Sequence, residues 1–349
     1  MTSPVPALSP NDGQAFAAWT PDREASVDRT LSRLEAAMPG LGPISVRRSL
    51  LADFSARLQS ARQEIASLVL QEVGKPIAES LGEVDYAVSF IDHYVDLLGQ
   101  VSFQESVFQG QRTDALPAGI ALLICAFNDP VAGLTRKIAP AVAAGCPVMI
   151  KPSPLGMMTA LAVMEHLEAA AARVAAAAAA ILASDDPAVI GRAMEHPGVA
   201  VVSFTGSTQV GRKVAETAGR GLSRCVLELG GNCPYVVLPD ADIDKAASDL
   251  VVRKRKAAGQ ACSAVNRVFV HRDIYASFRD KLLAGMEAVR SGPATAAEVE
   301  MGPVRTAESV RRLDVLVERG AALGERAIAT GARNADGPFL FPLTVLETE

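Results

Sequence analysis

Short apolar runs alternate with helical patterns between residues 117 and 229, and this alternation limits the possible folds more than any other feature of the 349-residue chain. The runs Gly119–Phe127, Cys146–Ile150 and Val199–Phe204 are typical of strands buried on both faces. A further strand is expected over Arg224–Leu229. Strands separated by helices over about a hundred residues predict a parallel sheet with right-handed crossovers.

Polar and glycine residues stand at or just beyond the ends of these strands. They are Asn128, Lys151, Gly206, Ser207 and Glu228. Ligands of parallel sheets bind at the carboxyl ends of the strands, so we expect these five residues to meet at one edge. Asn128 is also expected to cap the next helix, because Pro130 follows it in the first turn.

The flanking regions show helical periodicity before the sheet and a second strand–helix alternation after it. Helices are expected over Asp22–Met38, Arg47–Glu72, Ala78–Leu98, Ile274–Val289 and Val304–Leu323, an extended arm over Gln100–Asp114, and strands over Pro234–Leu238 and Arg267–His271. Asp240 or Asp242 is expected to cap a further helix that begins near Ile243.

Composition excludes several classes of protein. A net charge of −5 leaves no basic surplus to neutralise phosphates, which argues against a nucleic-acid binder. No apolar run is long enough to cross a membrane, and the N-terminus lacks a signal-peptide pattern. Five cysteines without paired spacing indicate reduced thiols and a cytoplasmic location. The four histidines lack metal-ligand spacing, so no metal site is expected.

Cys262 is the strongest candidate nucleophile. It follows Gly259-Gln260-Ala261 just past a long helical pattern, and a glycine-containing turn after a helix favours a catalytic role. A buried, inert cysteine is the alternative and is the commoner state of cysteine in general. A reactive thiolate would need N–H donors or positive charge close by, and the carboxyl end of the preceding helix does not supply them.

Glu228 and Asn128 complete a possible catalytic set. Glu228 stands between Leu227 and Leu229, and burial among apolar neighbours would raise its pKa toward that of a general base. A carboxylate that pairs with a lysine at the rim is the alternative. The Asn128 amide could stabilise an oxyanion, although by itself it could equally be only a helix cap.

Three further features could bind ligands. Lys151 directly follows a buried strand and could contact a ribose, or could simply be solvated. The turn around Gly206 and Ser207 lets a phosphate approach the start of a helix, but it lacks the dinucleotide fingerprint. The run Arg253-Lys254-Arg255-Lys256 is either a solvated helix face or a surface that favours an anionic aldehyde.

Taken together, five motifs resemble those of the aldehyde dehydrogenase superfamily, in the family order and with family-like spacing. They are Phe127-Asn128-Asp129-Pro130, Met149-Ile150-Lys151-Pro152-Ser153, Ser203-Phe204-Thr205-Gly206-Ser207-Thr208, Glu228-Leu229-Gly230-Gly231-Asn232 and Gly259-Gln260-Ala261-Cys262. The residues around Cys262 are further similar to those of semialdehyde dehydrogenases of the succinate-semialdehyde type.

The resemblance implies an α/β fold with a Rossmann-like cofactor domain and a second catalytic α/β domain. It implies oxidation of an aldehyde with NAD or NADP, with Cys262 as nucleophile, Asn128 as oxyanion donor and Glu228 as the base that activates water. Cofactor contacts fall on Lys151, Ser153, Phe204, Gly206, Ser207 and Gly230. The implied domains are a helical region with an arm at 1–115, a nucleotide-binding domain at 116–227 and a catalytic domain at 228–349.

Several positions depart from the family pattern. Pro154 stands where a ribose-binding glutamate is common, which makes NADP at least as plausible as NAD. Asp129 replaces an apolar residue, and Ala257 stands where asparagine is common. The Glu-x-Phe-Gly-Pro motif does not follow Cys262, so we expect a shortened member whose catalytic domain is incomplete and whose C-terminal oligomerisation segment is missing.

These departures keep three functions open. The first is an active dehydrogenase, which could still form a homo-oligomer. The second is an impaired relative that binds nucleotide or another subunit. The third is an esterase-like hydrolase that uses Cys262 and Glu228 without hydride transfer.

Overall fold

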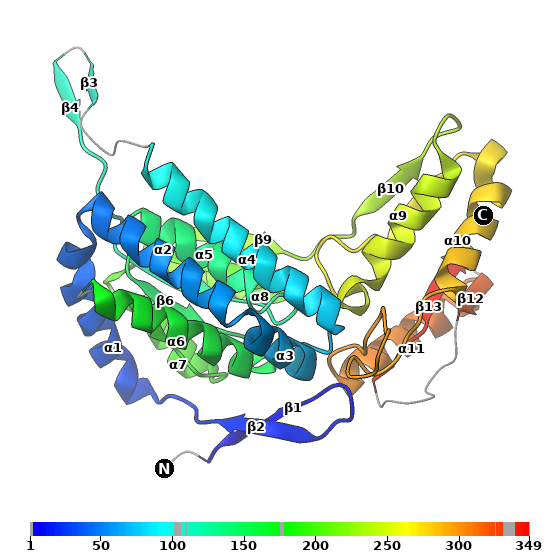
Figure 1. The fold of residues 1–349 in the computed structure, drawn as a ribbon, viewed down its shortest axis with the longest axis horizontal. Helices are drawn as coiled ribbons and strands as arrows, with labels where there is room; N and C mark the ends of the chain where they lie inside the picture. The colour runs from blue at the N-terminus through cyan, green and yellow to red at the C-terminus, as the bar shows by residue number, and fades with distance from the viewer. Residues whose placement is uncertain are drawn as a thin grey trace. The chain divides into compact units, whose positions relative to one another are not determined.

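The computed structural model describes residues 3–100, 106–108, 110–174, 178–324, 326–330 and 339–348 (Figure 1). The chain divides into two compact units. Unit 1 consists of residues 1–7, 17–68 and 81–229, and unit 2 consists of residues 8–16, 69–80 and 230–349. Each unit is described separately below.

A five-stranded parallel sheet forms the centre of unit 1. Its order is β7-β6-β5-β8-β9, with β5 in the middle and β9 at one edge. The strands are β5 (Ile120–Ile124), β6 (Val148–Lys151), β7 (Ala179–Ile181), β8 (Val199–Gly206) and β9 (Arg224–Leu229). The predicted α/β class and parallel sheet are therefore confirmed. All five residues of β5 are buried, as an uninterrupted apolar run requires.

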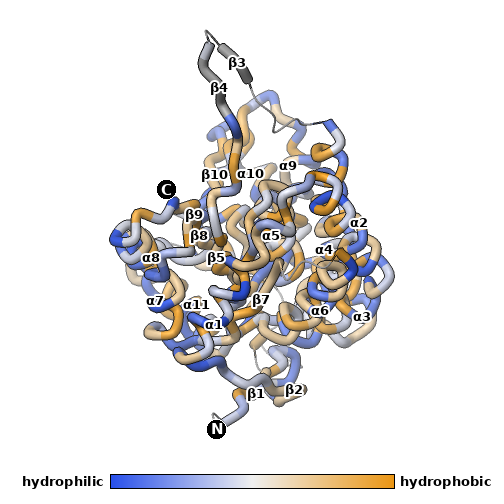
Figure 2. The backbone as a smooth tube through the Cα atoms, turned by 90° about the vertical axis from the view of Figure 1, so that its left-hand side faces the viewer, coloured by the Kyte–Doolittle hydropathy of each residue, from blue (hydrophilic) through white to orange (hydrophobic). Residues whose placement is uncertain are grey.

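Helices cover this sheet. They are α1 (Glu24–Ala37), α2 (Ile44–Ser60), α5 (Ala132–Ala143), α6 (Met157–Arg173), α7 (Pro187–Glu195) and α8 (Thr208–Arg220). One core cluster joins α1, α7 and α8 to alternate residues of the strands, including Ile120, Leu122 and Phe204. The α5 helix contacts β5 and β6, and α2 packs on α5 and α6. In Figure 2 the tube is mostly orange along the strands of this sheet.

The N-terminal helices differ in detail from the sequence prediction. The helix expected over Arg47–Glu72 is two helices, α2 and α3 (Arg62–Val73), because Ala61 leaves the helical conformation at φ −90° and ψ 10°. The next helix, α4 (Ile77–Leu98), was predicted within one residue of its observed start. Two short pairs, β1 (Val5–Leu8) with β2 (Ala15–Trp19) and β3 (Ser106–Phe108) with β4 (Gln111–Thr113), complete this part of the chain.

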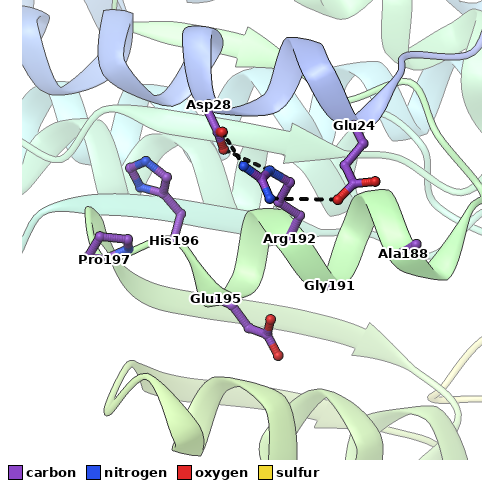
Figure 3. Close-up of a pocket in the computed structure, with 8 residues that line it drawn as sticks. All are labelled: Glu24, Asp28, Ala188, Gly191, Arg192, Glu195, His196 and Pro197. Atoms are coloured by element: carbon purple, nitrogen blue, oxygen red, sulfur yellow. Dashed lines mark hydrogen bonds and ion pairs between the residues drawn. The ribbon is translucent and has the colours of Figure 1, made fainter.

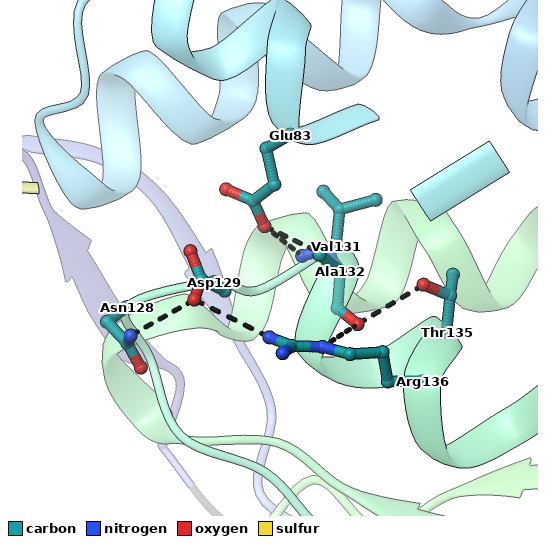
Figure 4. Close-up of polar contacts among 7 residues, drawn as sticks. All are labelled: Glu83, Asn128, Asp129, Val131, Ala132, Thr135 and Arg136. Carbon is teal, nitrogen blue, oxygen red and sulfur yellow. Dashed lines mark hydrogen bonds and ion pairs between the residues drawn. The ribbon is translucent and has the colours of Figure 1, made fainter. Parts of the chain in front are cut away.

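The start of α5 corrects the prediction that Asn128 caps this helix. The N-cap is Val131, and no side chain of its own segment caps it. Instead, the buried Glu83 carboxylate of α4 accepts hydrogen bonds from the backbone N–H groups of Val131 at 2.8 Å and Ala132 at 3.1 Å (Figure 4). The unpaired donors of a helix start are thus satisfied from a distant helix, which the local sequence could not reveal.

Unit 2 has a separate core. Its elements are β10 (Pro234–Val237), α9 (Ile243–Arg255), β11 (Arg267–Val270), α10 (Tyr275–Glu287), α11 (Ala307–Ala322), β12 (Arg326–Thr330) and β13 (Leu343–Glu347). The β10 and β11 strands pair in parallel, and β12 and β13 pair antiparallel. Asp242 caps α9 by accepting from the Lys245 N–H at 3.0 Å, as one of the two predicted alternatives. Apolar residues of β10, α9 and α10 pack together, among them Val237, Leu250 and Phe278.

Within the described residues, no helix is both long and apolar enough to span a membrane. The same residues contain no group of three or more His, Cys, Asp and Glu side chains that could hold a metal ion. Helix α6 ends at Arg173 and β7 begins at Ala179, while residues 175–177 lie outside the described residues.

Candidate active site

The carboxyl ends of the strands in unit 1 bring several predicted residues to one edge of the sheet. Lys151 at the end of β6 pairs with Ile124 of β5, which in turn pairs with Phe204 of β8. Thr205 of β8 pairs with Glu228 of β9. The predicted convergence at one rim is therefore confirmed for the residues of these strands, whereas their functional roles remain predictions.

Glu228 is exposed on the edge strand, so the predicted burial among apolar neighbours is wrong. Side chains alternate between the two faces of a strand, and here Leu227 and Leu229 are the residues packed against the core. Glu228 therefore projects from the opposite face. The sequence suggested burial because both neighbours are leucines, yet alternation makes those neighbours point away.

Lys137 of α5 is a candidate site residue that is not among those predicted from the sequence. Its Nζ donates to the Ser203 hydroxyl at 2.6 Å. Burial lowers the pKa of Lys137, while the nearby Cys125 and Glu228 act in the opposite direction. The sequence does contain an indication of this position, because Lys137 follows the buried Leu134 by three residues and so lies on the apolar stripe of α5.

Burial also shifts the pKa values of Cys125 and Lys151, in opposite directions. It raises the pKa of the Cys125 thiol to about 11, against the opposing charges of Lys137 and Lys151. It lowers the pKa of Lys151, which is buried at the end of β6, while Asp185 and Cys125 partly oppose the shift. Cys125 is thus an inert thiol, and Lys151 is a partly desolvated cation at the rim.

The turn after β8 is shaped by glycine. A Cβ at Gly206 would lie 2.6 Å from the Phe204 ring, so no other residue fits there without a shift. Phe204 itself is buried in the core and its ring lies against Gly206, while its predicted cofactor contact remains a prediction. Ser207 caps α8 by accepting from the Val210 N–H at 3.3 Å. Ser153 caps a short 3-10 turn in the same way, accepting from Leu155.

Asn128 is half-buried, and its amide is held by its neighbour. Asn128 Nδ2 donates to Asp129 at 3.2 Å, and the same Asp129 oxygen lies 3.6 Å from the Arg136 guanidinium (Figure 4). The departure at Asp129 therefore has a physical consequence: a carboxylate, partly neutralised by Arg136, orients the candidate oxyanion donor and occupies one of its two N–H groups.

In unit 2, Cys262 follows a strained turn and its side chain is exposed. Ala257 (φ 46°), Ala258 (φ 50°) and Gly259 (φ 75°) are all in the left-handed region. Alanine adopts this conformation at a cost of about 1–2 kcal/mol, whereas asparagine and glycine adopt it readily. The family's frequent asparagine at the position of Ala257 thus has a conformational reason.

Three groups fix the turn that precedes Cys262. The Glu79 carboxylate accepts from the Ala257 N–H at 2.9 Å. The Gln260 side chain donates to the Ala257 carbonyl at 2.8 Å and accepts from the Arg305 N–H at 2.9 Å. These bonds offset the backbone strain, so the turn is held by its own Gln260 and by groups of the distant Glu79 and Arg305.

A second cysteine lies beside Cys262. The half-buried Cys233 thiol donates to the Cys262 carbonyl at 3.0 Å. Gly231 also lies near the Cys262 carbonyl oxygen, since a Cβ at that position would be 3.8 Å from this atom. This contact could not be predicted from the sequence, because the two cysteines are 29 residues apart.

The basic run at the end of α9 divides between two roles. Lys254 donates to Asn266 at 2.5 Å, and Arg255 forms a 2.6 Å ion pair with Glu300. Arg253 and Lys256 are exposed. Half of the run therefore stabilises unit 2, and only the other half remains available to favour an anionic ligand.

Among the described residues, each unit has a hollow at its surface. In unit 1, a surface hollow of about 620 Å³ between α1 and α7 contains Arg192, which is already paired with Asp28 and Glu24 (Figure 3). In unit 2, a groove of about 870 Å³ is lined by apolar side chains of α9, α10 and α11 and by Gly231, Gly259 and Gln260. The unit 2 groove thus borders the turn that carries Cys262.

The predicted site residues come from both units. Asn128, Lys151, Ser153, Phe204, Gly206, Ser207 and Glu228 belong to unit 1, and Gly230 and Cys262 belong to unit 2. The turn around Cys262 and the rim of the sheet are each well defined within their own unit.

Comparison with known proteins assigns this architecture to a family. The family model described as "Aldehyde dehydrogenase family" matches residues 2–348. A non-phosphorylating aspartate-semialdehyde dehydrogenase of Halomonas elongata is 35% identical over 294 residues, which are 83% of this chain and 59% of that protein. The NADP(+) succinate-semialdehyde dehydrogenase of Escherichia coli is 30% identical over 97% of this chain and 73% of its own length.

Solved structures of related enzymes superimpose on nearly the whole chain. A succinate-semialdehyde dehydrogenase of Burkholderia pseudomallei superimposes with a TM-score of 0.93 at 30% identity, covering 99% of this chain and 72% of that one. A mutant aldehyde dehydrogenase of Pseudomonas syringae, solved with NAD+ and octanal, gives a TM-score of 0.93 at 26% identity with the same coverage. The chain therefore spans between 59% and 73% of the length of these relatives.

Proposed function

The chain belongs to the aldehyde dehydrogenase family, and from this we propose that it oxidises an aldehyde to a carboxylate with NAD(P)+ through a thioester on Cys262. The observation that carries the proposal is the exposed Cys262 thiol after a strained turn that Glu79, Gln260 and Arg305 hold in place. Strained, over-determined backbone of this kind is typical of functional sites.

The chemistry follows from the groups that the chain supplies. The Cys262 sulfur bonds to the aldehyde carbon, and the Asn128 amide and the Cys262 N–H donate to the oxyanion that results. A nicotinamide cofactor, when bound, supplies the acceptor for the hydride. Glu228 then takes a proton from water, whose oxygen attacks the thioester carbon, and the carboxylate product leaves as the Cys262 thiol re-forms.

The rim of unit 1 fits such a cofactor. Lys151 presents a buried ammonium group at the end of β6, where it could hydrogen-bond a ribose. Gly206 packs closely on the Phe204 ring, and Ser207 is the N-cap of α8, whose N-terminal end favours an anion. We therefore assign nucleotide binding to the sheet of unit 1 and the nucleophile to unit 2.

The preference between NAD+ and NADP+, which differ by a 2′-phosphate, should depend on the charge at position 154. A glutamate at this position would repel a 2′-phosphate, and Pro154 carries no charge. We propose that NADP+ is accepted at least as well as NAD+. The variant Pro154→Glu should lower kcat/KM for NADP+ about tenfold more than for NAD+, which corresponds to about 1.4 kcal/mol.

Aldehydes that carry a carboxylate are the proposed substrate class. The relatives named above act, by their names, on aspartate and succinate semialdehydes. In unit 2 the exposed Arg253 and Lys256 add positive charge beyond the paired Lys254 and Arg255, which would attract an anionic substrate.

The proposal is tested by following NAD(P)H absorbance with a panel of aldehydes that includes succinate semialdehyde and its uncharged analogue butanal. We expect turnover by the wild type and by Cys225→Ser, and loss of turnover in Cys262→Ser. If no aldehyde is oxidised with either nucleotide, the dehydrogenase proposal is wrong. Equilibrium dialysis with NAD+ and NADP+ then distinguishes a nucleotide-binding relative from an esterase-like hydrolase that needs no nucleotide.

A further inference from the structure

We propose that Cys233 and Cys262 form a peroxide-responsive thiol pair that closes to an intramolecular disulfide. This inference does not depend on dehydrogenase activity, because it concerns two sulfur atoms within unit 2. It starts from the contact already described, in which Cys233 Sγ lies 3.0 Å from the carbonyl oxygen of Cys262.

The structure places the Cys233 sulfur against the main chain of Cys262. Cys233 Sγ lies 3.0 Å from the Cys262 carbonyl oxygen, and a carbonyl oxygen lies about 2.4 Å from the Cα of its own residue, so Cys233 Sγ is at most about 5.4 Å from the Cys262 Cα. A disulfide forms where the two Cα atoms lie about 4.4–6.8 Å apart. The Cys262 side chain is exposed, so rotation about its Cα–Cβ bond is the movement that would bring its sulfur toward Cys233.

The two sulfurs differ in access, which gives each a separate role. Cys262 is exposed and meets a dissolved oxidant first, whereas Cys233 is half-buried beside it. An exposed thiol next to a second thiol is the arrangement of redox-sensing cysteines, in which the second sulfur resolves the oxidised first one. Of the other cysteines, Cys125 and Cys146 are buried, and burial raises the pKa of Cys125 to about 11.

The chemistry balances with a peroxide as oxidant. The Cys262 thiolate attacks one peroxide oxygen, the O–O bond breaks, hydroxide leaves, and a sulfenic acid forms. The Cys233 thiolate then attacks the Cys262 sulfur, an S–S bond forms, and the S–O bond breaks with loss of a second hydroxide. Two thiols and one hydrogen peroxide thus give one disulfide and two waters, and a dithiol reductant reverses the bond.

The consequence is protection of the more exposed thiol. Without a partner, a sulfenic acid is oxidised onward to sulfinic and sulfonic acids that dithiols do not reduce. With Cys233 close by, the oxidised sulfur is captured in a reducible form. If Cys262 is the nucleophile of the proposed function, the disulfide also switches turnover off reversibly.

The experiment treats the purified full chain with hydrogen peroxide, alkylates the remaining thiols and maps peptides. Trypsin places Cys262 in residues 257–267 and Cys233 in residues 225–245, which also contain Cys225. The matched variant Cys225→Ser removes this ambiguity, since Cys225 is the other exposed thiol. We expect the crosslink between the two peptides to persist in Cys225→Ser, to be absent in Cys233→Ser, and to disappear with dithiothreitol.

A second measurement follows the fate of Cys262. In the wild type, the alkylatable fraction of Cys262 should return fully after reduction, whereas in Cys233→Ser it should not, because Cys262 is found as sulfinic or sulfonic acid. Irreversible oxidation of wild-type Cys262 with Cys233 still alkylatable, or a crosslink that requires Cys225, would overturn the proposal. Both readouts are by mass, so they stand even if no aldehyde is a substrate.

Discussion

At the scale of single residues, backbone conformation gives a physical meaning to one departure from the family pattern, the alanine at position 257. Ala257 occupies a left-handed position in which a Cβ is unfavourable. The strain is retained next to the candidate nucleophile, where Glu79 and Gln260 hold the same residue by its N–H and carbonyl groups. The sequence shows only that Ala257 is unusual for the family.

Replacement of Ala257 by glycine should therefore stabilise the protein. We expect Ala257→Gly to raise the free energy of unfolding by about 0.5–1 kcal/mol, because relief of the left-handed strain exceeds the entropy gained by the unfolded chain. Urea unfolding measures this. The control Ala246→Gly, inside α9, should lower the free energy of unfolding by about 0.5–1 kcal/mol, and a similar loss at Ala257 would contradict the strain.

The burial of the Lys137 ammonium group predicts that the stability of the folded chain depends on pH. Burial lowers its pKa in the folded state from the ordinary 10.5, so the folded chain releases this proton before the unfolded chain does. The destabilisation by the buried charge is complete below the folded pKa and diminishes as the pH rises through it toward 10.5.

The measurement compares wild type with Lys137→Gln by urea unfolding between about pH 7 and pH 10. We expect the stability of the wild type, relative to the variant, to increase as the pH rises. The exposed Lys213 of α8 provides the control in Lys213→Gln. A difference between wild type and Lys137→Gln that stays flat with pH, or falls, would show that burial does not penalise this charge.

At the scale of elements, helix α4 has a role that its amphipathic pattern does not predict. Glu83 caps α5 in unit 1, and Glu79, one turn earlier, holds the turn before Cys262 in unit 2. The pattern of apolar residues predicts the helix, but from this pattern both glutamates would be expected to face solvent. Each is instead a hydrogen-bond acceptor for backbone groups distant in sequence.

Loss of the Glu79 carboxylate should therefore impair the reaction without weakening substrate binding. For Glu79→Ala we expect kcat to fall about tenfold with KM nearly unchanged, because a lost hydrogen bond of about 1.4 kcal/mol loosens the turn. Steady-state kinetics with the best aldehyde measures this. In Glu79→Gln the amide oxygen still accepts from Ala257, so kcat should recover to within about threefold. Equal losses in both variants would show that Glu79 acts through its charge and not as an acceptor for this turn.

At the scale of the molecule, each unit contains a hydrophobic core cluster of its own among the described residues. The core of unit 1 includes residues from Val27 to Ala218, and that of unit 2 includes residues from Val237 to Leu343. Trp19 is the only tryptophan of the chain and is buried in unit 1, so its fluorescence reports on that unit.

A cavity in one core should then act mainly on its own unit. We expect Leu250→Ala to destabilise unit 2 by about 2–5 kcal/mol and to shift the unfolding midpoint seen by circular dichroism. The midpoint of Trp19 fluorescence should remain within error of the wild type, whereas Val202→Ala in unit 1 should shift it. Coincident shifts of both signals in Leu250→Ala would show that the two cores unfold as one.

The sequence by itself determined the class of fold, the parallel sheet, most helices, and the residues at the rim. Apolar runs such as Gly119–Phe127 can be buried only in the middle of a covered sheet, and five spaced motifs identify the family. Tertiary structure alone decided the exposure of Glu228, the Glu83 cap of α5, the place of Lys137 and the contact between Cys233 and Cys262. The physical reason is that local patterns encode which face of an element is apolar, whereas hydrogen bonds between distant segments depend on how those segments pack.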